Sequence, residues 1–148
     1  LGEVIGINTA VSYEGEAVAF AIPINDAKRA IEDVQTYGRI VRPWLGVRYV
    51  LVVPDDVEDA NIEYEVGAMI VKGDQPGQPA VFEGSPADLA GLRDNDVILS
   101  IDEVSLSAEA GLAELLAIYR PGDIINLGIL REGVMIDVLV TLSEYGEE

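Results

Sequence analysis

The stretch Gly84-Ser85-Pro86-Ala87-Asp88-Leu89-Ala90-Gly91-Leu92, followed closely by Asp96-Val97-Ile98, decides the fold that the sequence predicts. Ser85 is a good helix N-cap, and a proline suits the first helical position that follows it. Gly91 is a residue type that ends helices. The apolar run over residues 96–101 predicts a strand at the centre of a sheet. This stretch therefore predicts a short helix leading into a central strand.

Around this stretch, residues 42–148 alternate short apolar segments with turn residues. The capping residue Ser107 predicts a second helix that reaches Tyr119, before Pro121-Gly122. One helical turn is expected over residues 55–60, and a Gly/Pro-rich loop over 72–79. The other expected strands cover residues 45–53, 67–71, 80–83, 124–130 and 134–142, the last two forming a hairpin across residues 131–133. The predicted fold class is α+β, with a small, partly open β-barrel flanked by two helices.

Residues 1–41 carry a different pattern. Residues 2–11 and 17–22 predict two strands joined by a turn over residues 12–16, and Pro23 stops the second strand. Asn25 is the expected N-cap of a helix that Gly38 ends. A lone hairpin is marginally stable in water, so this segment needs a larger sheet than it contains. We place the domain boundary near Val41, which gives domains 1–41 and 42–148.

The charge balance excludes several partner classes. The 148 residues include 27 acidic and nine basic side chains, for a net charge of −18. A surface this negative repels phosphates, so neither nucleic acid nor an anionic membrane is an expected partner. No apolar stretch is long enough to span a bilayer, and no signal peptide is recognisable at the first residues.

Cysteine and histidine are both absent from the sequence. Their absence removes thiol nucleophiles, disulfides, Cys/His zinc sites and any imidazole base. A Ser–His–Asp triad therefore cannot form within this chain. A Ser–Lys pair would have only Lys28 and Lys72 to use, and no serine motif lies beside either. We expect no catalytic residues, no metal site and no cofactor here.

Three stretches resemble the HtrA (Deg) family of serine proteases. Residues 2–10 (GEVIGINTA), followed by residues 20–25 (FAIPIN), resemble the end of that family's protease domain. Residues 42–47 (RPWLGV) resemble the start of its PDZ domain. Residues 84–92, with the strand after them, are similar to the most characteristic PDZ segment of bacterial proteases. The resemblance covers nearly the whole chain, most weakly at residues 55–65 and 72–79.

The resemblance implies how the domains are built and where they work. Residues 1–41 would be a hairpin and helix from a trypsin-like β-barrel, and residues 42–148 a PDZ domain. In that family the triad precedes the segment that Leu1 begins, so the parent protein would be a serine endopeptidase. Asn8, Thr9 and Ala10 would lie on the strand that pairs with substrate, a role that is vestigial here. The family implies a bacterial, extracytoplasmic location.

The resemblance also implies a peptide-binding groove. Its carboxylate-binding loop would be Trp44, Leu45, Gly46 and Val47, where glycine lets a ligand backbone approach and consecutive N–H groups bind an anion. The groove itself would be lined by Arg48, Tyr49, Leu112 and Leu116. We expect Leu112 to be the first choice for the pocket and Leu115 to lie nearer the core.

The sequence is compatible with three functions. The first is a binding module that adds the C-terminus of a polypeptide, or an unfolded segment, to a sheet edge. We expect an apolar last residue preceded by neutral or basic positions, with roughly micromolar affinity. The second is an endopeptidase, which the missing histidine opposes. The third is a structural role, in which the exposed edges of the N-terminal hairpin assemble a homo-oligomer.

Overall fold

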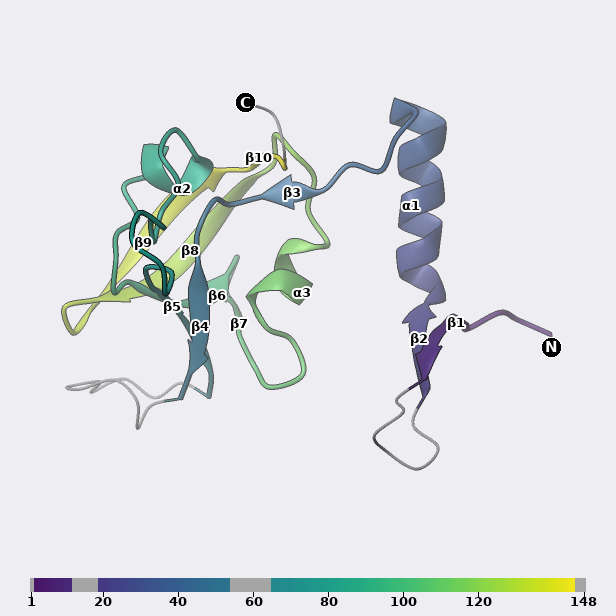
Figure 1. The fold of residues 1–148 in the computed structure, drawn as a ribbon, viewed down its shortest axis with the longest axis horizontal. Coiled ribbons are helices and arrows are strands. Elements are labelled where there is room, and N and C mark those ends of the chain that lie inside the picture. The colour runs from purple at the N-terminus through teal and green to yellow at the C-terminus, as the bar shows by residue number, and fades with distance from the viewer. Residues whose placement is uncertain (1, 12–18, 54–64, 146–148) are drawn as a thin grey trace. The chain divides into compact units, whose positions relative to one another are not determined.

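The computed structural model describes residues 2–11, 19–53 and 65–145. The chain divides into two compact units, Leu1–Val41 and Arg42–Glu148, and each is considered by itself (Figure 1). The turn expected over residues 12–16 and the helical turn expected over 55–60 lie outside the described residues. None of the described helices has the length and apolar composition needed to cross a membrane.

The first unit contains the predicted hairpin and helix. Strand β1 (Gly6–Val11) pairs antiparallel with β2 (Ala19–Pro23). Asn8 lies opposite Ala21 and Ala10 opposite Phe20, so Thr9 is an extra residue that forms a bulge. The Thr9 hydroxyl donates to the carbonyl of Phe20 at 3.3 Å. The expected strand is therefore present, with a local irregularity in its pairing.

Helix α1 (Ile24–Tyr37) follows β2 directly. The expected N-cap at Asn25 is wrong: Pro23 is the capping residue and makes no side-chain hydrogen bond. The physical reason is that the N–H of Ile24 donates to the carbonyl of Ile5 at 3.0 Å, which draws Asn25 into the first turn. The end of the helix is as predicted, because Gly38 is left-handed (φ 72°) and donates to Val34.

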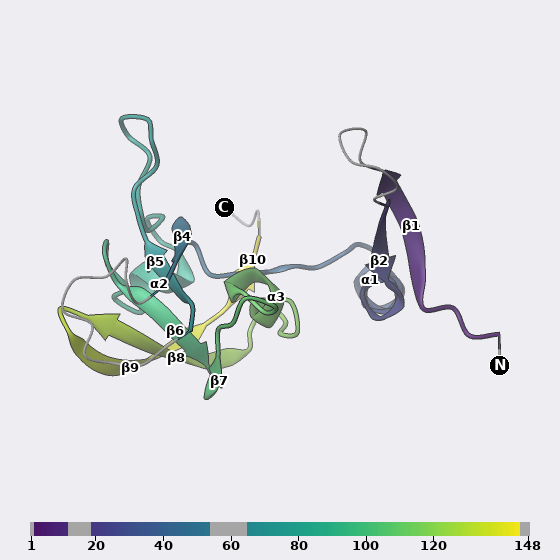
Figure 2. The ribbon, with the colours of Figure 1, turned by 90° about the horizontal axis from the view of Figure 1, so that it is seen from below.

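The second unit is built on one antiparallel sheet with the order β4-β5-β6-β8-β9, and β7 pairs with β6 (Figure 2). The prediction that residues 96–101 form a central strand is confirmed, because β6 lies between β5 and β8. The sheet is not closed into a barrel, and the α+β class is confirmed. The strands are β4 (Tyr49–Val52), β5 (Gly67–Ile70), β6 (Val97–Ile101), β7 (Val104–Ser105), β8 (Ile124–Arg131) and β9 (Val134–Thr141).

Two short strands and two short helices complete this unit. Strand β3 (Pro43–Trp44) pairs with β10 (Ser143–Glu144). Helix α2 (Pro86–Leu89) has the predicted cap, since the Ser85 side chain accepts a hydrogen bond from the N–H of Asp88. Helix α3 covers Leu112–Leu116.

Helix α3 is shorter than the sequence predicted, and its cap is Gly111. The Ser107 side chain accepts instead from the N–H of Ala110 at 3.2 Å, and the Ser107 N–H donates to the Ala110 carbonyl at 3.0 Å. These bonds close a turn ahead of the helix. Ser107 therefore accepts a local backbone hydrogen bond, as serine often does, but the helix begins later than the sequence predicted.

The strand predicted over residues 45–53 is interrupted. Gly46 has a φ of +84°, so the chain leaves β3, turns, and re-enters a sheet as β4. Between them Val47 makes an isolated bridge to Val81, and that bridge is all that forms of the strand expected over 80–83. The turn at Gly46 is the feature that positions the candidate site.

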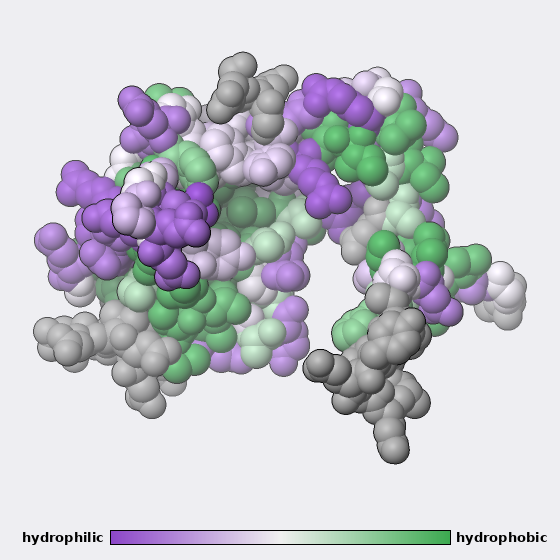
Figure 3. Space-filling view, viewed as in Figure 1, coloured by the Kyte–Doolittle hydropathy of each residue, from purple (hydrophilic) through white to green (hydrophobic). Residues whose placement is uncertain are grey.

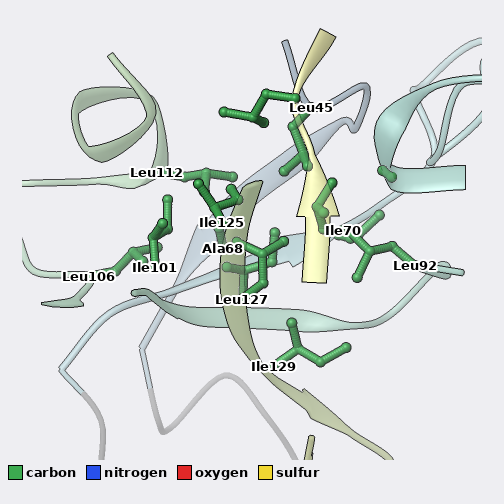
Figure 4. Close-up of a cluster of buried hydrophobic side chains, with 14 of the residues drawn as sticks. Leu45, Ala68, Ile70, Leu92, Ile101, Leu106, Leu112, Ile125, Leu127 and Ile129 are labelled. Carbon is green, nitrogen blue, oxygen red and sulfur yellow. The ribbon is translucent and has the colours of Figure 1, made fainter. Parts of the chain in front are cut away.

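Most of the core lies on one face of the sheet (Figure 4). Ile70, Ile98, Ile125 and Ile129 have no exposed surface. A smaller group on the other face consists of Val52, Val97, Leu99 and Leu130, with Met69 packed against it. The alternation of Val97, Ile98 and Leu99 between the two groups follows the two-residue period of β6. Both faces of the central strand are thus buried.

A buried ion pair joins the stretch that decided the fold to the β8–β9 hairpin. The Asp96 side chain is only 2% exposed, and the guanidinium of Arg131 donates to both of its oxygens, at 2.7 and 2.6 Å. Asp96 also accepts from the N–H of Arg93 at 2.7 Å, and Arg131 donates to the carbonyl of Gly91 at 2.9 Å. Hydrogen bonds to Asp96 raise the pKa of Arg131 further above its ordinary value.

Candidate functional site

Two carbonyls of the loop from Trp44 to Val47, those of Leu45 and Gly46, are bonded inward. The carbonyl of Leu45 accepts from the N–H of Ala87 at 2.9 Å. The carbonyl of Gly46 accepts from the N–H of Phe82 at 3.0 Å and from the Ser85 hydroxyl at 3.3 Å. Within the described part of the chain, the N–H groups of Gly46 and Val47 have no acceptor. Two neighbouring donors are therefore left for an external group.

Glycine is required at position 46 for two separate reasons. Its φ of +84° lies in the left-handed region that side chains disfavour. A Cβ at this position would also collide with the Cβ and hydroxyl of Ser85. The conspicuous stretch at residues 84–92 thus supports the loop through Ser85 and Ala87. Sequence reasoning found both segments but not the contact between them.

Strand β4 follows this loop and forms an end of the sheet. Arg48 directs its backbone inward, donating to the carbonyl of Ala80 at 2.8 Å and accepting from the N–H of Val71 at 3.0 Å. Because backbone groups alternate along a strand, those of Val47 and Tyr49 point to the open side. Among the strands that the structure describes, the one that begins beside the unpaired N–H groups therefore has a free edge.

The Tyr49 side chain of β4 reaches Ala113 and Glu114 of α3, and we call the surface that these two elements share the candidate groove. Val47 and Tyr49 pack against the main core together with Leu115, Leu116 and Tyr119. Apolar surface, green in Figure 3, covers β4 and continues toward α3. The exposed apolar residues contributed by β4 include Val50 and Leu51. The candidate groove therefore has an apolar lining beside a strand edge.

Tyr49 connects the two walls of the candidate groove. Burial and the carboxylate of Glu114 raise the pKa of Tyr49, while a backbone hydrogen bond from Ala113 lowers it. These causes put the Tyr49 hydroxyl next to the first turn of α3. The Glu114 carboxylate folds back over Gly111 at the start of the same turn.

The segment that follows α3 is bonded to the turn between β6 and β7. The Tyr119 hydroxyl donates to Asp102 at 2.8 Å, and the other carboxylate oxygen of Asp102 accepts from the N–H of Asn126 at 2.8 Å. Burial and the bond to Asp102 raise the pKa of Tyr119 to about 12. The turn is held by two left-handed residues, Asp102 (φ 47°) and Glu103 (φ 68°).

The predicted groove residues do not all lie where the sequence suggested. Leu112 is 1% exposed and sits beside Ile125 in the main core, whereas Leu115 and Leu116 are half-buried (Figure 4). The expectation that Leu115 lies deeper than Leu112 is therefore wrong. Leu112 is the first residue of α3, whereas the sequence predicted a helix that begins earlier.

The remaining predicted residues divide between the two units. Arg48 and Tyr49 border the loop and β4, as expected from their sequence positions. Asn8, Thr9 and Ala10 lie on β1 in the first unit. Among the residues that the structure describes, no three carboxylates come together in a way that would hold a metal ion.

The sequence of the chain is similar to those of known proteins. The PDZ domain family matches residues 43–142. The chain belongs to the PDZ domain family. It is 34% identical, over 99% of its length, to a probable periplasmic serine endoprotease DegP-like of Chlamydia muridarum, and 33% identical, over 96%, to the periplasmic pH-dependent serine endoprotease DegQ of Escherichia coli.

Solved structures extend the match through both units. The structure of the HtrA-type protease AlgW with tripeptide covers 99% of the chain at 29% identity, with a TM-score of 0.73. The chain spans 29% and 30% of the two curated relatives and 47% of this structure. The resemblance to HtrA proteases is therefore confirmed for the PDZ domain and the segment before it.

Proposed function

We propose that residues 42–148 capture the C-termini of peptides or unfolded proteins by adding them as a strand to the free edge of β4. The observation that carries this proposal is the loop at Gly46 and Val47. The carbonyls of Leu45 and Gly46 are bonded inward, and the N–H groups of Gly46 and Val47 have no acceptor in the described chain. A terminal carboxylate is the anion that such donors suit, and the strand edge that follows suits the backbone behind it.

The lining of the candidate groove supports an apolar last residue. Val47 and Tyr49 share the face that packs toward α3, so a side chain opposite them meets an apolar surface. One buried apolar anchor contributes about 1.5–3 kcal/mol, and each charge-assisted hydrogen bond to the carboxylate about as much. Association costs at least about 4 kcal/mol, which leaves roughly micromolar binding. The net charge of −18 favours neutral or basic residues further upstream.

In the whole protein, this capture would serve a serine endopeptidase that works outside the cytoplasm. The relatives named above are periplasmic endoproteases by name, and the present chain contains no histidine for a triad. We propose that the PDZ unit feeds or regulates such a protease, with Asn8, Thr9 and Ala10 belonging to its substrate strand.

The experiment is a titration with a labelled octapeptide ending in valine, prepared with a free or an amidated C-terminus. Amidation removes the charge that the loop would bind, so we expect at least a tenfold weaker affinity, the equivalent of about 1.4 kcal/mol. Equal binding of the two peptides would contradict the proposal.

A pair of glycine variants tests the loop itself. Gly46→Ala introduces the Cβ that collides with Ser85 and should weaken binding of the free peptide. Gly133→Ala is the matched control, because Gly133 is also left-handed (φ 77°) but has no atom within 4 Å of the added Cβ. It should cost some stability and leave the affinity unchanged.

A further inference from the structure

Glu114 places a negative charge on the α3 side of the candidate groove. It lies in the first turn of α3 and is exposed. Its side chain folds back over Gly111, because a Cβ added at Gly111 would lie 3.0 Å from Oε2 of Glu114. In the part of the chain that the structure describes, no basic side chain forms an ion pair with this carboxylate. The charge is therefore accessible to a cation from outside the fold.

The Tyr49 side chain shows that this carboxylate lies within reach of β4. Its hydroxyl forms a hydrogen bond with the backbone of Ala113, the residue before Glu114, and the Glu114 charge acts on the same hydroxyl. One side chain that starts on β4 therefore extends as far as the first turn of α3. Lysine and arginine side chains are comparable in length to that of tyrosine, so a basic side chain that runs beside Tyr49 covers the same distance.

The proposed register determines which ligand side chain runs beside Tyr49. If the terminal carboxylate is bound at Gly46 and Val47, the last peptide residue lies opposite Val47 and the third from last lies opposite Tyr49. Directly opposite residues of an antiparallel pair share one face of the sheet, with Cβ atoms about 4.5–5.5 Å apart. The face that carries Tyr49 is the one that packs with α3 against the main core. The side chain of the third residue from the end therefore extends towards Glu114.

We propose that Glu114 makes the candidate groove select peptides whose third residue from the C-terminus is lysine or arginine. The inference rests on the proposed function and adds one position to it. A basic side chain at this position brings its charge to the Glu114 carboxylate and lays its methylene groups along the Tyr49 ring. The net charge of −18 attracts a basic peptide wherever its charge lies. A preference for one position is therefore what a local ion pair adds.

The test uses two labelled octapeptides of identical composition and charge, each made of alanines, one lysine and a terminal valine. The lysine is third from the end in one peptide and sixth from the end in the other. The wild-type chain should bind the first peptide about two- to fivefold more tightly, which is the range expected of an exposed cross-strand ion pair. The ratio should approach one at high salt. Equal affinities at low salt would overturn the inference, even if amidation still weakens the binding of both peptides.

Variants of Glu114 assign the preference to this side chain. Glu114→Gln should bind the two peptides equally, while Glu114→Asp should retain part of the difference. Glu132→Gln is the matched control, because it removes the same charge from the turn between β8 and β9 and should leave the ratio intact. An acidic residue in a first helical turn also stabilises the helix, so the readout is the ratio of two affinities within one variant.

The outcomes separate the inference from the function on which it rests. A ratio that survives unchanged in Glu114→Gln would refute the role given to this carboxylate and leave capture of C-termini standing. Failure of the amidation experiment, in contrast, would reject the proposed function and the inference with it.

Discussion

Both units of the chain contain regular helices and strands, but they differ in how many apolar side chains they bury. In the PDZ unit, the strands β5, β6 and β8 contribute isoleucines that have no exposed surface. In the first unit, none of the apolar side chains that the structure describes is buried. Phe20 and Ile31 are both 57% exposed. Local patterns therefore suffice to form a hairpin and a helix, whereas a core requires contacts between distant segments.

This difference also bears on the third function that the sequence left open. Apolar residues on β1, β2 and α1 form a surface that a larger sheet or a second copy would cover. The homo-oligomer proposed from the hairpin stays a prediction, and the same surface suits the protease domain that the HtrA relatives carry.

The largest effect should come from the buried ion pair of the PDZ unit. Asp96→Ala leaves Arg131 without its partner and should lower the free energy of unfolding by about 4 kcal/mol. The matched control is Asp94→Ala, because Asp94 pairs with Lys72, whose side chain is 71% exposed. That change should cost less than about 1 kcal/mol. Urea unfolding followed by the fluorescence of Trp44, the only tryptophan, measures both. Similar losses in the two variants would contradict the expectation that the buried pair of Asp96 contributes more to stability than the exposed pair of Asp94.

The comparison between the units can be tested with one substitution made in each. Ile98→Ala creates a cavity in a fully buried site and should cost about 3 kcal/mol. Ile31→Ala removes a side chain that is already mostly in water and should change stability by less than about 0.5 kcal/mol. Calorimetry of both variants checks this. A large loss for Ile31→Ala would show that the exposed face of α1 is covered in solution, and so would break the comparison.

A smaller effect should come from the hydrogen bond between Tyr119, which follows α3, and Asp102. Tyr119→Phe removes the hydrogen bond to Asp102 and should cost about 1 kcal/mol at neutral pH. Tyr37→Phe, in the first unit, is the control and should have no effect, because Tyr37 is 53% exposed.

The same bond predicts a dependence on pH. The folded state raises the pKa of Tyr119 to about 12, so it favours the protonated phenol. This contribution is fully present below the ordinary tyrosine pKa of about 10 and is lost as the pH rises towards 12. Urea unfolding at about pH 9 and about pH 11.5 should therefore show a larger fall for the wild type than for Tyr119→Phe. Parallel falls would contradict the role given to this bond.

The sequence predicted most elements because their signals are local. Ser85 and Pro86 begin α2, and Gly38 ends α1, as the sequence predicted. The misplaced caps at Asn25 and Ser107 had the right residue types, but tertiary bonds to Ile5 and a closed turn at Ala110 decided where the helices start. Local propensity cannot report such contacts.

The sequence predicted the loop and the strand of the candidate site, but not how their residues are arranged in space. Gly46 was expected to let a ligand approach, yet its contact with Ser85 depends on how two distant segments meet. The sequence put the start of α3 too early and did not show that Leu112 lies in the core. The buried Nε of Arg48, which has no partner among the described residues, could not be foreseen, because the sequence does not show which groups surround it in three dimensions.

Because Gly46 and Ser85 are in contact, the residue at one position limits which residues the other can accept, although the two lie far apart in the chain. Ser85 caps α2, donates to the carbonyl of Gly46, and fills the space in which a Cβ at position 46 would lie. A larger residue at 85 would be rejected even though helix capping alone tolerates several types. Libraries that aim to change ligand preference should therefore keep both positions fixed, or randomise them together.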